Sequence, residues 1–139
     1  MNTRRNSIRK RVAALGVAIV AATAGTAAVA SPAQAAPTGC PFGSFCVYKH
    51  INYDYYGGIY TAYGQDANWG NNTFQDGSRV RRNDSSWFNN GAEGPGIPSY
   101  VQVFGGGSMT ICLRAGTGFP RKPASSDRGE KHYWAYNCE

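Results

Sequence analysis

The sequence predicts an all-β fold, a small sandwich or barrel of short strands that is stapled by disulfide bonds. Short apolar and aromatic stretches recur between turns rich in glycine. No stretch after residue 35 shows the 3.6-residue apolar period of an amphipathic helix. All four cysteines and all aromatic residues lie in that same part of the chain, so we expect a largely aromatic core.

Residues 1–35 are predicted to be a secretory signal peptide. Five basic side chains precede residue 12, residues 12–30 are uncharged and rich in alanine and valine, and Ala33-Gln34-Ala35 offers a small-x-small cleavage site. A membrane anchor is the alternative, but the processing site follows the apolar run at once. We therefore expect a secreted, extracellular domain of residues 36–139, with no membrane attachment after cleavage.

Most of the net positive charge of the chain lies in this predicted signal peptide. Five of the 14 basic residues and none of the 8 acidic residues precede residue 36, so the net charge of +6 falls to +1 in the remainder. A nucleic-acid partner is not expected, because only the short cluster Arg79, Arg81 and Arg82 stays basic. That cluster is interpreted as a solvated strand face, with an acidic partner as the alternative.

The even number of cysteines in an exported chain predicts two disulfides. Three pairings are possible, of which we favour Cys40–Cys46 and Cys112–Cys138. A metal site is the competing interpretation, but the chain has no CxxC motif and only two histidines, His50 and His132. We expect no metal, no cofactor and a monomer.

The first element is a β-hairpin, with strands over residues 44–49 and 58–62. Valine and tyrosine suit a pleated, half-buried surface, and Gly57-Gly58 permits a tight reversal after an aromatic-rich bend. Residues 63–77 follow as a polar loop with room for one helical turn.

The rest of the chain is predicted to hold four more strands. They are expected over residues 79–89, 100–104, 109–114 and 132–136. Residues 90–98 are rich in glycine and proline and are interpreted as a linker between halves of about 40–90 and 99–139. Residues 116–129 are expected to be a loop.

A faint repeat accompanies this division. Phe45-Cys46-Val47-Tyr48 is similar to Ile111-Cys112-Leu113-Arg114: each stretch has an apolar residue, a cysteine, an aliphatic residue and a long side chain with a polar tip. Two copies of a four-stranded unit would explain the similarity, and coincidence between two short strands is the alternative.

Three features resemble a known family: the leader from Cys40 to Cys46, the tyrosine-rich residues 48–58, and Ser85-Ser86 followed by Asn89-Asn90. Together they resemble secreted actinobacterial peptidase inhibitors related to the Streptomyces metalloproteinase inhibitor. The resemblance implies a βγ-crystallin-like Greek-key sandwich. It also implies an extracellular protease as partner, a metalloprotease being favoured and a serine protease the alternative.

Many βγ-crystallin units bind Ca²⁺ through two Asn or Asp residues that precede a Ser-rich pair. Here Arg81 and Arg82 stand at those two positions before Ser85-Ser86, and arginine offers no acceptor and repels a cation. The second half has Ser125-Ser126 without matching Asn or Asp. We expect no tight calcium site in either half.

The resemblance also implies an inhibitory site at Cys112, Leu113 and Arg114. In the typical inhibitor a disulfide-tied Cys-Val bond followed by Arg resembles substrate, and Leu113 supplies the bulky aliphatic residue that thermolysin-like enzymes favour just after the bond they cut. A rigid loop avoids the ordering cost of a flexible substrate. Two features depart from that pattern, because the next cysteine is as distant as Cys138 and the stretch lies on a predicted strand, where Leu113 would be core.

An enzyme is not expected, because no nucleophile or metal motif stands out and His50 with Asp54 is interpreted as a solvent-facing strand end. The rival function is a carbohydrate-binding, cell-wall-binding or antifungal killer-toxin-like protein. Its platform would be formed by the tyrosines Tyr53, Tyr55, Tyr56, Tyr60 and Tyr63. Exposed, stacked rings would favour that function, and buried rings would favour a role in the scaffold.

Overall fold

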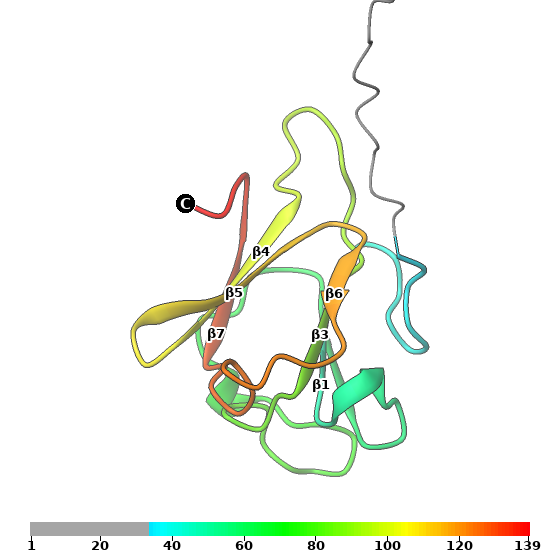
Figure 1. The fold of residues 1–139 in the computed structure, drawn as a ribbon, viewed down its shortest axis with the longest axis vertical. Coiled ribbons are helices and arrows are strands. Elements are labelled where there is room, and N and C mark those ends of the chain that lie inside the picture. Colours follow the sequence, from blue (N-terminus) through cyan, green and yellow to red (C-terminus); the bar gives the residue numbers. More distant parts are fainter. Residues whose placement is uncertain (1–33) are drawn as a thin grey trace, which may run out of the picture. The chain divides into compact units, whose positions relative to one another are not determined.

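The computed structural model describes residues 34–139, so the predicted signal peptide lies outside the described residues except for its last two. Antiparallel strands form two sheets, joined by loops and two short 3-10 helices (Figure 1). The strands are β1 (Phe45–Tyr48), β2 (Ile59–Ala62), β3 (Ser86–Asn89), β4 (Tyr100–Gly105), β5 (Ser108–Arg114), β6 (Thr117–Phe119) and β7 (Lys131–Ala135). The helices are η1 (Ile51–Tyr53) and η2 (Trp69–Asn71). The prediction of an all-β fold is confirmed, and no helix of the described part is long and apolar enough to span a membrane.

The first sheet has the strand order β2-β1-β3-β6. Its centre is β1, which is buried along its whole length and pairs antiparallel with both β2 and β3. The predicted hairpin is therefore present, with η1 inside its bend. Gly58 closes the bend at φ 114°, a conformation that favours glycine, and a side chain there would crowd Phe74.

The second sheet has the strand order β5-β4-β7. Side chains of β4 alternate between half-buried and buried, so Val101 and Val103 point into the core while their neighbours face outward. A register shift between Val103 and Phe104 bends the hairpin of β4 and β5.

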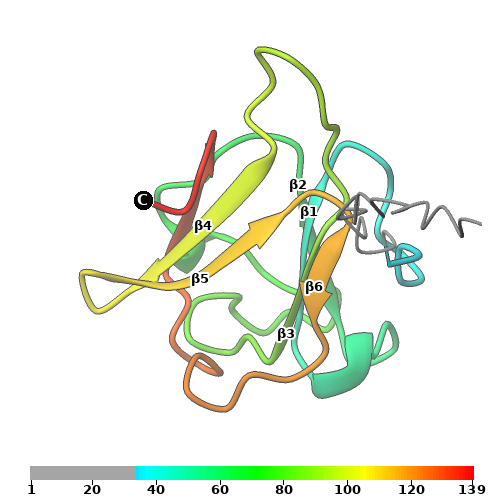
Figure 2. The ribbon, with the colours of Figure 1, turned by 45° about the horizontal axis from the view of Figure 1, so that its top comes forward.

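The two sheets exchange segments. β6 follows β5 in the chain but pairs with β3 of the first sheet (Figure 2). Asp66, from the first part of the chain, forms an isolated bridge with His132 of β7. The prediction of a loop over residues 116–129 was wrong for β6. Its small Gly118 is needed, because a Cβ there would lie 2.5 Å from the carbonyl oxygen of Trp87.

The exchange also bears on the faint sequence repeat. β1 lies inside its sheet, whereas β5 lies at the edge of the other. The two similar stretches therefore do not occupy equivalent positions, and their similarity follows from their shared pattern of inward-facing apolar residues.

The predicted strand over residues 79–89 is shorter than expected and begins only at Ser86. Arg82 has a positive φ of 57°, and its N–H donates to Gly129 O at 2.8 Å. Residues 79–84 are therefore not a strand: Arg79 forms an isolated bridge with Thr73, and Arg81 lies in a turn, so the two arginines do not share a strand face.

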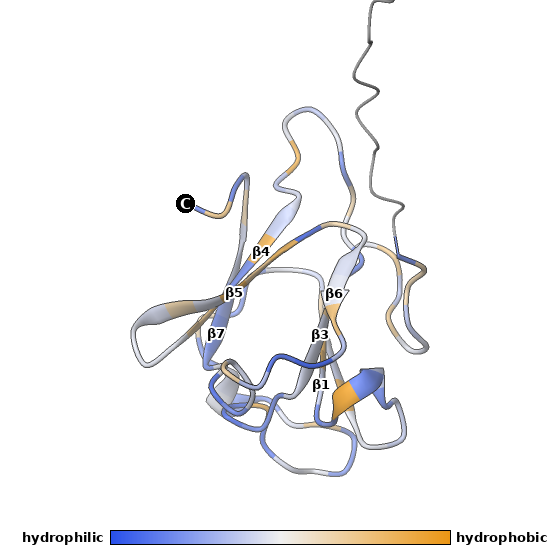
Figure 3. Ribbon diagram, viewed as in Figure 1, coloured by the Kyte–Doolittle hydropathy of each residue, from blue (hydrophilic) through white to orange (hydrophobic). Residues whose placement is uncertain are grey.

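The core between the sheets joins two kinds of side chain. The part of the chain before residue 90 supplies large rings, including Phe45, Trp69 and Trp87, which are fully buried. The later part supplies aliphatic side chains from β4 and β5, whose hydrophobic stretches are visible in Figure 3. The expected aromatic core is confirmed for its largest members.

Disulfides join Cys40 to Cys46 and Cys112 to Cys138. The first closes the leader before β1, and the second ties β5 to the C-terminal residues beyond β7. In the chain-entropy model they contribute about 2 and about 3.5 kcal/mol respectively, because the second closes the longer loop.

Candidate inhibitory loop

The three residues predicted as the inhibitory site lie in strand β5 and not in a loop. Leu113 is only 3% exposed, packs in the core cluster and is the register partner of Val101. Arg114 is exposed and Cys112 is half-buried. The alternation of apolar residues at Ile111 and Leu113 explains this placement, since it directs both side chains into the core.

The outer edge of β5 is also partly covered. The carbonyl oxygen of Thr110 accepts hydrogen bonds from Lys122 Nζ at 3.2 Å and from Ser125 Oγ at 2.9 Å. The carbonyl oxygen of Arg114 accepts from Thr117 Oγ1 at 2.6 Å. The side chain of Leu113 could enter an enzyme pocket only by leaving the core.

A different segment is presented to solvent, the connection between β3 and β4, here named the β3–β4 loop (residues 90–99). It projects as an arch at the end of the sandwich away from η1 (Figure 1). The sequence predicted this segment as a linker from its glycine and proline content. The same content places Pro95 and Gly96 in a turn in which Ile97 N donates to Gly94 O at 3.1 Å, with Gly96 at φ 74°.

A buried asparagine holds the two ends of this loop together. The side chain of Asn89 is fully buried, and its Nδ2 donates to Ser99 O at 3.1 Å as well as to Leu113 O. Its Oδ1 accepts from Gly91 N at 2.9 Å. One amide therefore fixes the second and the last residue of the loop, and two of its three bonds are buried away from competing water.

Two further contacts brace the loop from its sides. Arg114 forms a bidentate ion pair with Glu93, at 2.6 and 3.1 Å. Asn90 Nδ2 donates to Cys40 O at 2.8 Å, which joins the loop to the disulfide-closed leader. The ion pair is exposed and screened by solvent, so it adds little to stability. Its main effect is to hold the loop in one orientation.

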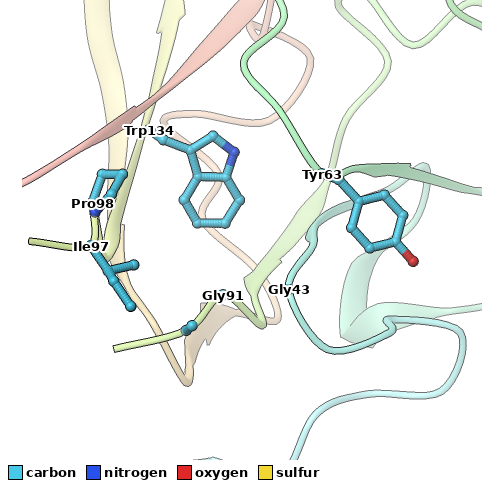
Figure 4. Close-up of a pocket in the computed structure, with 7 residues that line it drawn as sticks. Gly43, Tyr63, Gly91, Ile97, Pro98 and Trp134 are labelled. Atoms are coloured by element: carbon cyan, nitrogen blue, oxygen red, sulfur yellow. The ribbon is translucent and has the colours of Figure 1, made fainter. Parts of the chain in front are cut away.

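A pocket of about 310 Å³ opens beneath the loop. Its lining residues are Gly43, Tyr63, Gly91, Ala92, Ile97, Pro98 and Trp134. Figure 4 shows the indole of Trp134 between Ile97 and Pro98 on one side and Tyr63 on the other. A Cβ on Gly91 would lie 2.5 Å from that ring, so glycine is needed for this close approach.

Two of the lining residues are exposed, and two further exposed rings belong to segments that adjoin the lining. We call these four side chains the apolar rim: Phe42, Tyr63, Ile97 and Tyr136. They are 75%, 67%, 41% and 67% exposed. Phe42 precedes the pocket residue Gly43, and the hydroxyl of Tyr136 donates to Gly96 O at 3.4 Å. Exposed apolar side chains gathered in this way are typical of a binding surface.

The five tyrosines proposed as a sugar platform do not form one surface. Tyr53 and Tyr60 are half-buried, and Tyr60 donates to Asp66 at 2.7 Å. Tyr55 and Tyr56 are exposed, but their rings meet at 76°. Tyr63 belongs to the apolar rim instead.

Three charged residues singled out from the sequence, Arg81, Arg82 and Asp54, form hydrogen bonds within the protein. Arg81 and Arg82 both donate to Glu130 Oε1, at 2.9 and 2.7 Å, and Arg81 is the main cause that lowers the pKa of Glu130 to about 2. Asp54 accepts from the N–H groups of Tyr56 and Gly57 and so belongs to a turn. Both arginine guanidinium groups therefore contact a carboxylate of the protein itself.

Within residues 34–139, no three His, Cys, Asp or Glu side chains come close enough to hold a metal ion. In the serine pair that would belong to a calcium site of other βγ-crystallin units, the Ser86 hydroxyl already has two partners within this protein. It donates to His50 O at 2.6 Å and accepts from Tyr53 N at 3.1 Å. The absence of tight calcium binding stays a prediction.

Buried titratable groups lie in the core and not at the loop. His132 is fully buried and accepts from Trp69 Nε1 through Nδ1 at 2.9 Å, so its Nε2 carries the proton and faces Gly64 O at 2.9 Å. Burial lowers the pKa of His132. The ring is neutral, with both nitrogens paired, and has a structural role.

Comparison with known proteins agrees with this geometry. A solved structure described as "Evolution of the eye lens beta-gamma-crystallin domain fold" is similar at a TM-score of 0.51, covering 70% of this chain and 91% of its own, with 18% sequence identity. At that identity the likeness shows the fold alone, which is a βγ-crystallin fold. No curated protein matches the chain.

A family model described as "Peptidase inhibitor family I36" matches residues 33–113. The match includes β1 to β4, most of β5, the β3–β4 loop and the leader disulfide. The resemblance drawn from the sequence is thereby confirmed, and the protein is an inhibitor and not an enzyme. The chain belongs to peptidase inhibitor family I36.

Proposed function

We propose that the protein is a secreted, monomeric inhibitor of metalloproteases that acts through a rigid, substrate-like loop. The observation that carries the proposal is the exposed β3–β4 loop, which a buried asparagine and an ion pair hold in place in a chain of a peptidase inhibitor family. Rigid presentation favours tight binding because little conformational entropy is lost on association.

Secretion is supported by two features. The two disulfides are of the kind that persist in an oxidising compartment. The residues at the predicted cleavage site, Gln34 to Ala36, are exposed and so accessible to a processing enzyme. A metalloprotease target is favoured over a serine protease because the exposed loop carries a bulky aliphatic side chain, Ile97, which suits the residue just after the cut.

The test is a titration of the mature, oxidised protein against a thermolysin-like metalloprotease, with a subtilisin-like serine protease as the comparison enzyme. We expect residual metalloprotease activity to fall linearly to zero at one equivalent of inhibitor. Inhibition of the subtilisin-like enzyme alone would reassign the target class. Activity of both enzymes unchanged by a large excess of inhibitor would contradict the proposed function.

A further inference from the structure

We infer that the β3–β4 loop supplies the residue that enters the protease and that this residue is Ile97, not Leu113. The inference rests on the proposed function and names the side chain that performs it. Ile97 is 41% exposed on the arch of the loop, whereas Leu113 is 3% exposed in the core. The specificity pocket of an enzyme can accept only a side chain that is exposed to solvent in the free inhibitor. In the folded protein the side chain of Ile97 is exposed in this way.

The residues around Ile97 match the needs of a metalloprotease site. A thermolysin-like enzyme cuts just before a bulky aliphatic residue, so its pocket for that residue would take the Ile97 side chain. Gly96 has no side chain to obstruct the approach. The neighbouring apolar rim and the pocket beneath the loop add an apolar surface that the rim of the enzyme cleft can cover.

The same residues make the loop a poor substrate. Pro98 has no N–H, so it cannot donate the backbone hydrogen bond that an extended substrate would offer at this position. The Ile97 N–H is engaged with Gly94 O, and the Gly96 carbonyl accepts from Tyr136. The Gly96–Ile97 peptide bond therefore lies in a turn and not in the extended conformation that cleavage requires. Hydrogen bonds within the inhibitor hold the residues on both sides of this bond.

Asn89 and Arg114 act as positioning residues in this account. Asn89 fixes both ends of the loop, and Arg114 holds Glu93 within it. Arg114 was predicted as part of the inhibitory site from its place after Leu113. Through its contact with Glu93, Arg114 acts indirectly, because this ion pair connects β5 to the β3–β4 loop that would contact the enzyme.

The test compares inhibition constants of single variants against the same metalloprotease. Ile97→Ser is expected to weaken inhibition by about 30-fold or more, the size of effect that defines a hot-spot residue. Ile97→Val keeps an aliphatic side chain and should stay within about 5-fold of the wild type, since about one methylene is lost. Tyr56→Ala is the matched control, because Tyr56 is 97% exposed in the bend near η1.

The outcomes separate this inference from the proposed function. A wild-type protein that inhibits no protease would overturn both. A wild-type inhibitor whose Ile97→Ser variant is equally potent would overturn only the assignment to Ile97. Leu113→Ala, checked for folding by its thermal transition, gives a second reading: a folded Leu113→Ala variant without inhibition, beside a fully active Ile97→Ser variant, would return the site to β5.

Discussion

At the scale of single residues, the most informative group in the core is Asp84. Its carboxylate is fully buried and accepts from Trp87 Nε1 at 2.8 Å and from Gly129 N at 2.9 Å. It thereby joins the start of β3 to the segment that leads into β7. Burial raises the pKa of Asp84 to about 6, although both hydrogen bonds oppose the shift.

This pKa predicts a pH dependence of stability. Because the folded pKa lies above the ordinary value of an aspartate, the folded state binds the proton more tightly, so the contribution of Asp84 is fully present below about pH 4 and is lost as the pH rises through 6. Between pH 4.5 and 7.5 the loss should be about 2 kcal/mol. Urea unfolding of the wild type and of Asp84→Asn over this range measures the difference in the free energy of unfolding.

The comparison with Asp84→Asn removes an opposing effect. The pKa of His132 is lowered, so its contribution is present above about pH 6.5 and is lost as the pH falls, and it is common to both proteins. The difference curve therefore reports Asp84 alone. A difference that is flat with pH, or that rises with pH, would show that the carboxylate is not held in this buried setting.

Residue-level prediction from the sequence depends on how many roles a residue type can play. The exclusion of Arg82 as a calcium ligand rests on its chemistry alone and stays a prediction. Asn89 was noted only as part of a family pattern, because its role depends on Ser99 and Leu113, which are distant in sequence. Leu113 was assigned to both an inhibitory site and a core position, and only the three-dimensional structure shows that its side chain faces inward.

At the scale of elements, the two disulfides stabilise different parts of the fold. Cys112–Cys138 joins residues 26 apart in the sequence, and Cys40–Cys46 joins residues 6 apart. Replacing Cys112 and Cys138 by serine should lower the free energy of unfolding by about 3.5 kcal/mol, and replacing Cys40 and Cys46 by about 2 kcal/mol, because the longer closed loop restricts the unfolded chain more. Urea denaturation of the two double variants measures both values.

The order of these two effects is the critical result. A larger loss for the Cys40–Cys46 pair would mean that strain or packing, and not loop closure, sets the contribution of each disulfide. The prediction also bears on the inhibitory loop. Since Asn89 and not Cys112 anchors the β3–β4 loop, the variant without Cys112–Cys138 should keep its inhibition wherever it remains folded.

Strands were predicted accurately where their sequences carry a clear apolar pattern. β1, β4 and β5 carry clear alternating or continuous apolar residues and were placed within a residue or two of their observed ends. β6 was missed because Thr117-Gly118-Phe119 is short and lies between turns. Its pairing with β3 is decided by the close approach of two backbones, which no local pattern indicates.

At the scale of the whole molecule, the exchange between the sheets explains where the loop lies. β6 is paired to β3 and Asp66 is bridged to β7, so each sheet is closed by a segment from the other part of the chain. The β3–β4 loop crosses from one sheet to the other at one end of this sandwich. The linker expected from its glycine and proline content is therefore a short, braced arch.

The central claim is that this arch occupies the active site of a metalloprotease. The most direct measurement is calorimetric binding of the wild-type protein to a thermolysin-like enzyme, with the active site either free or filled by a small zinc-directed inhibitor. The account predicts tight one-to-one binding to the free enzyme and loss of that binding to the filled enzyme. Equal binding to both forms would place the contact outside the active site and would contradict the account.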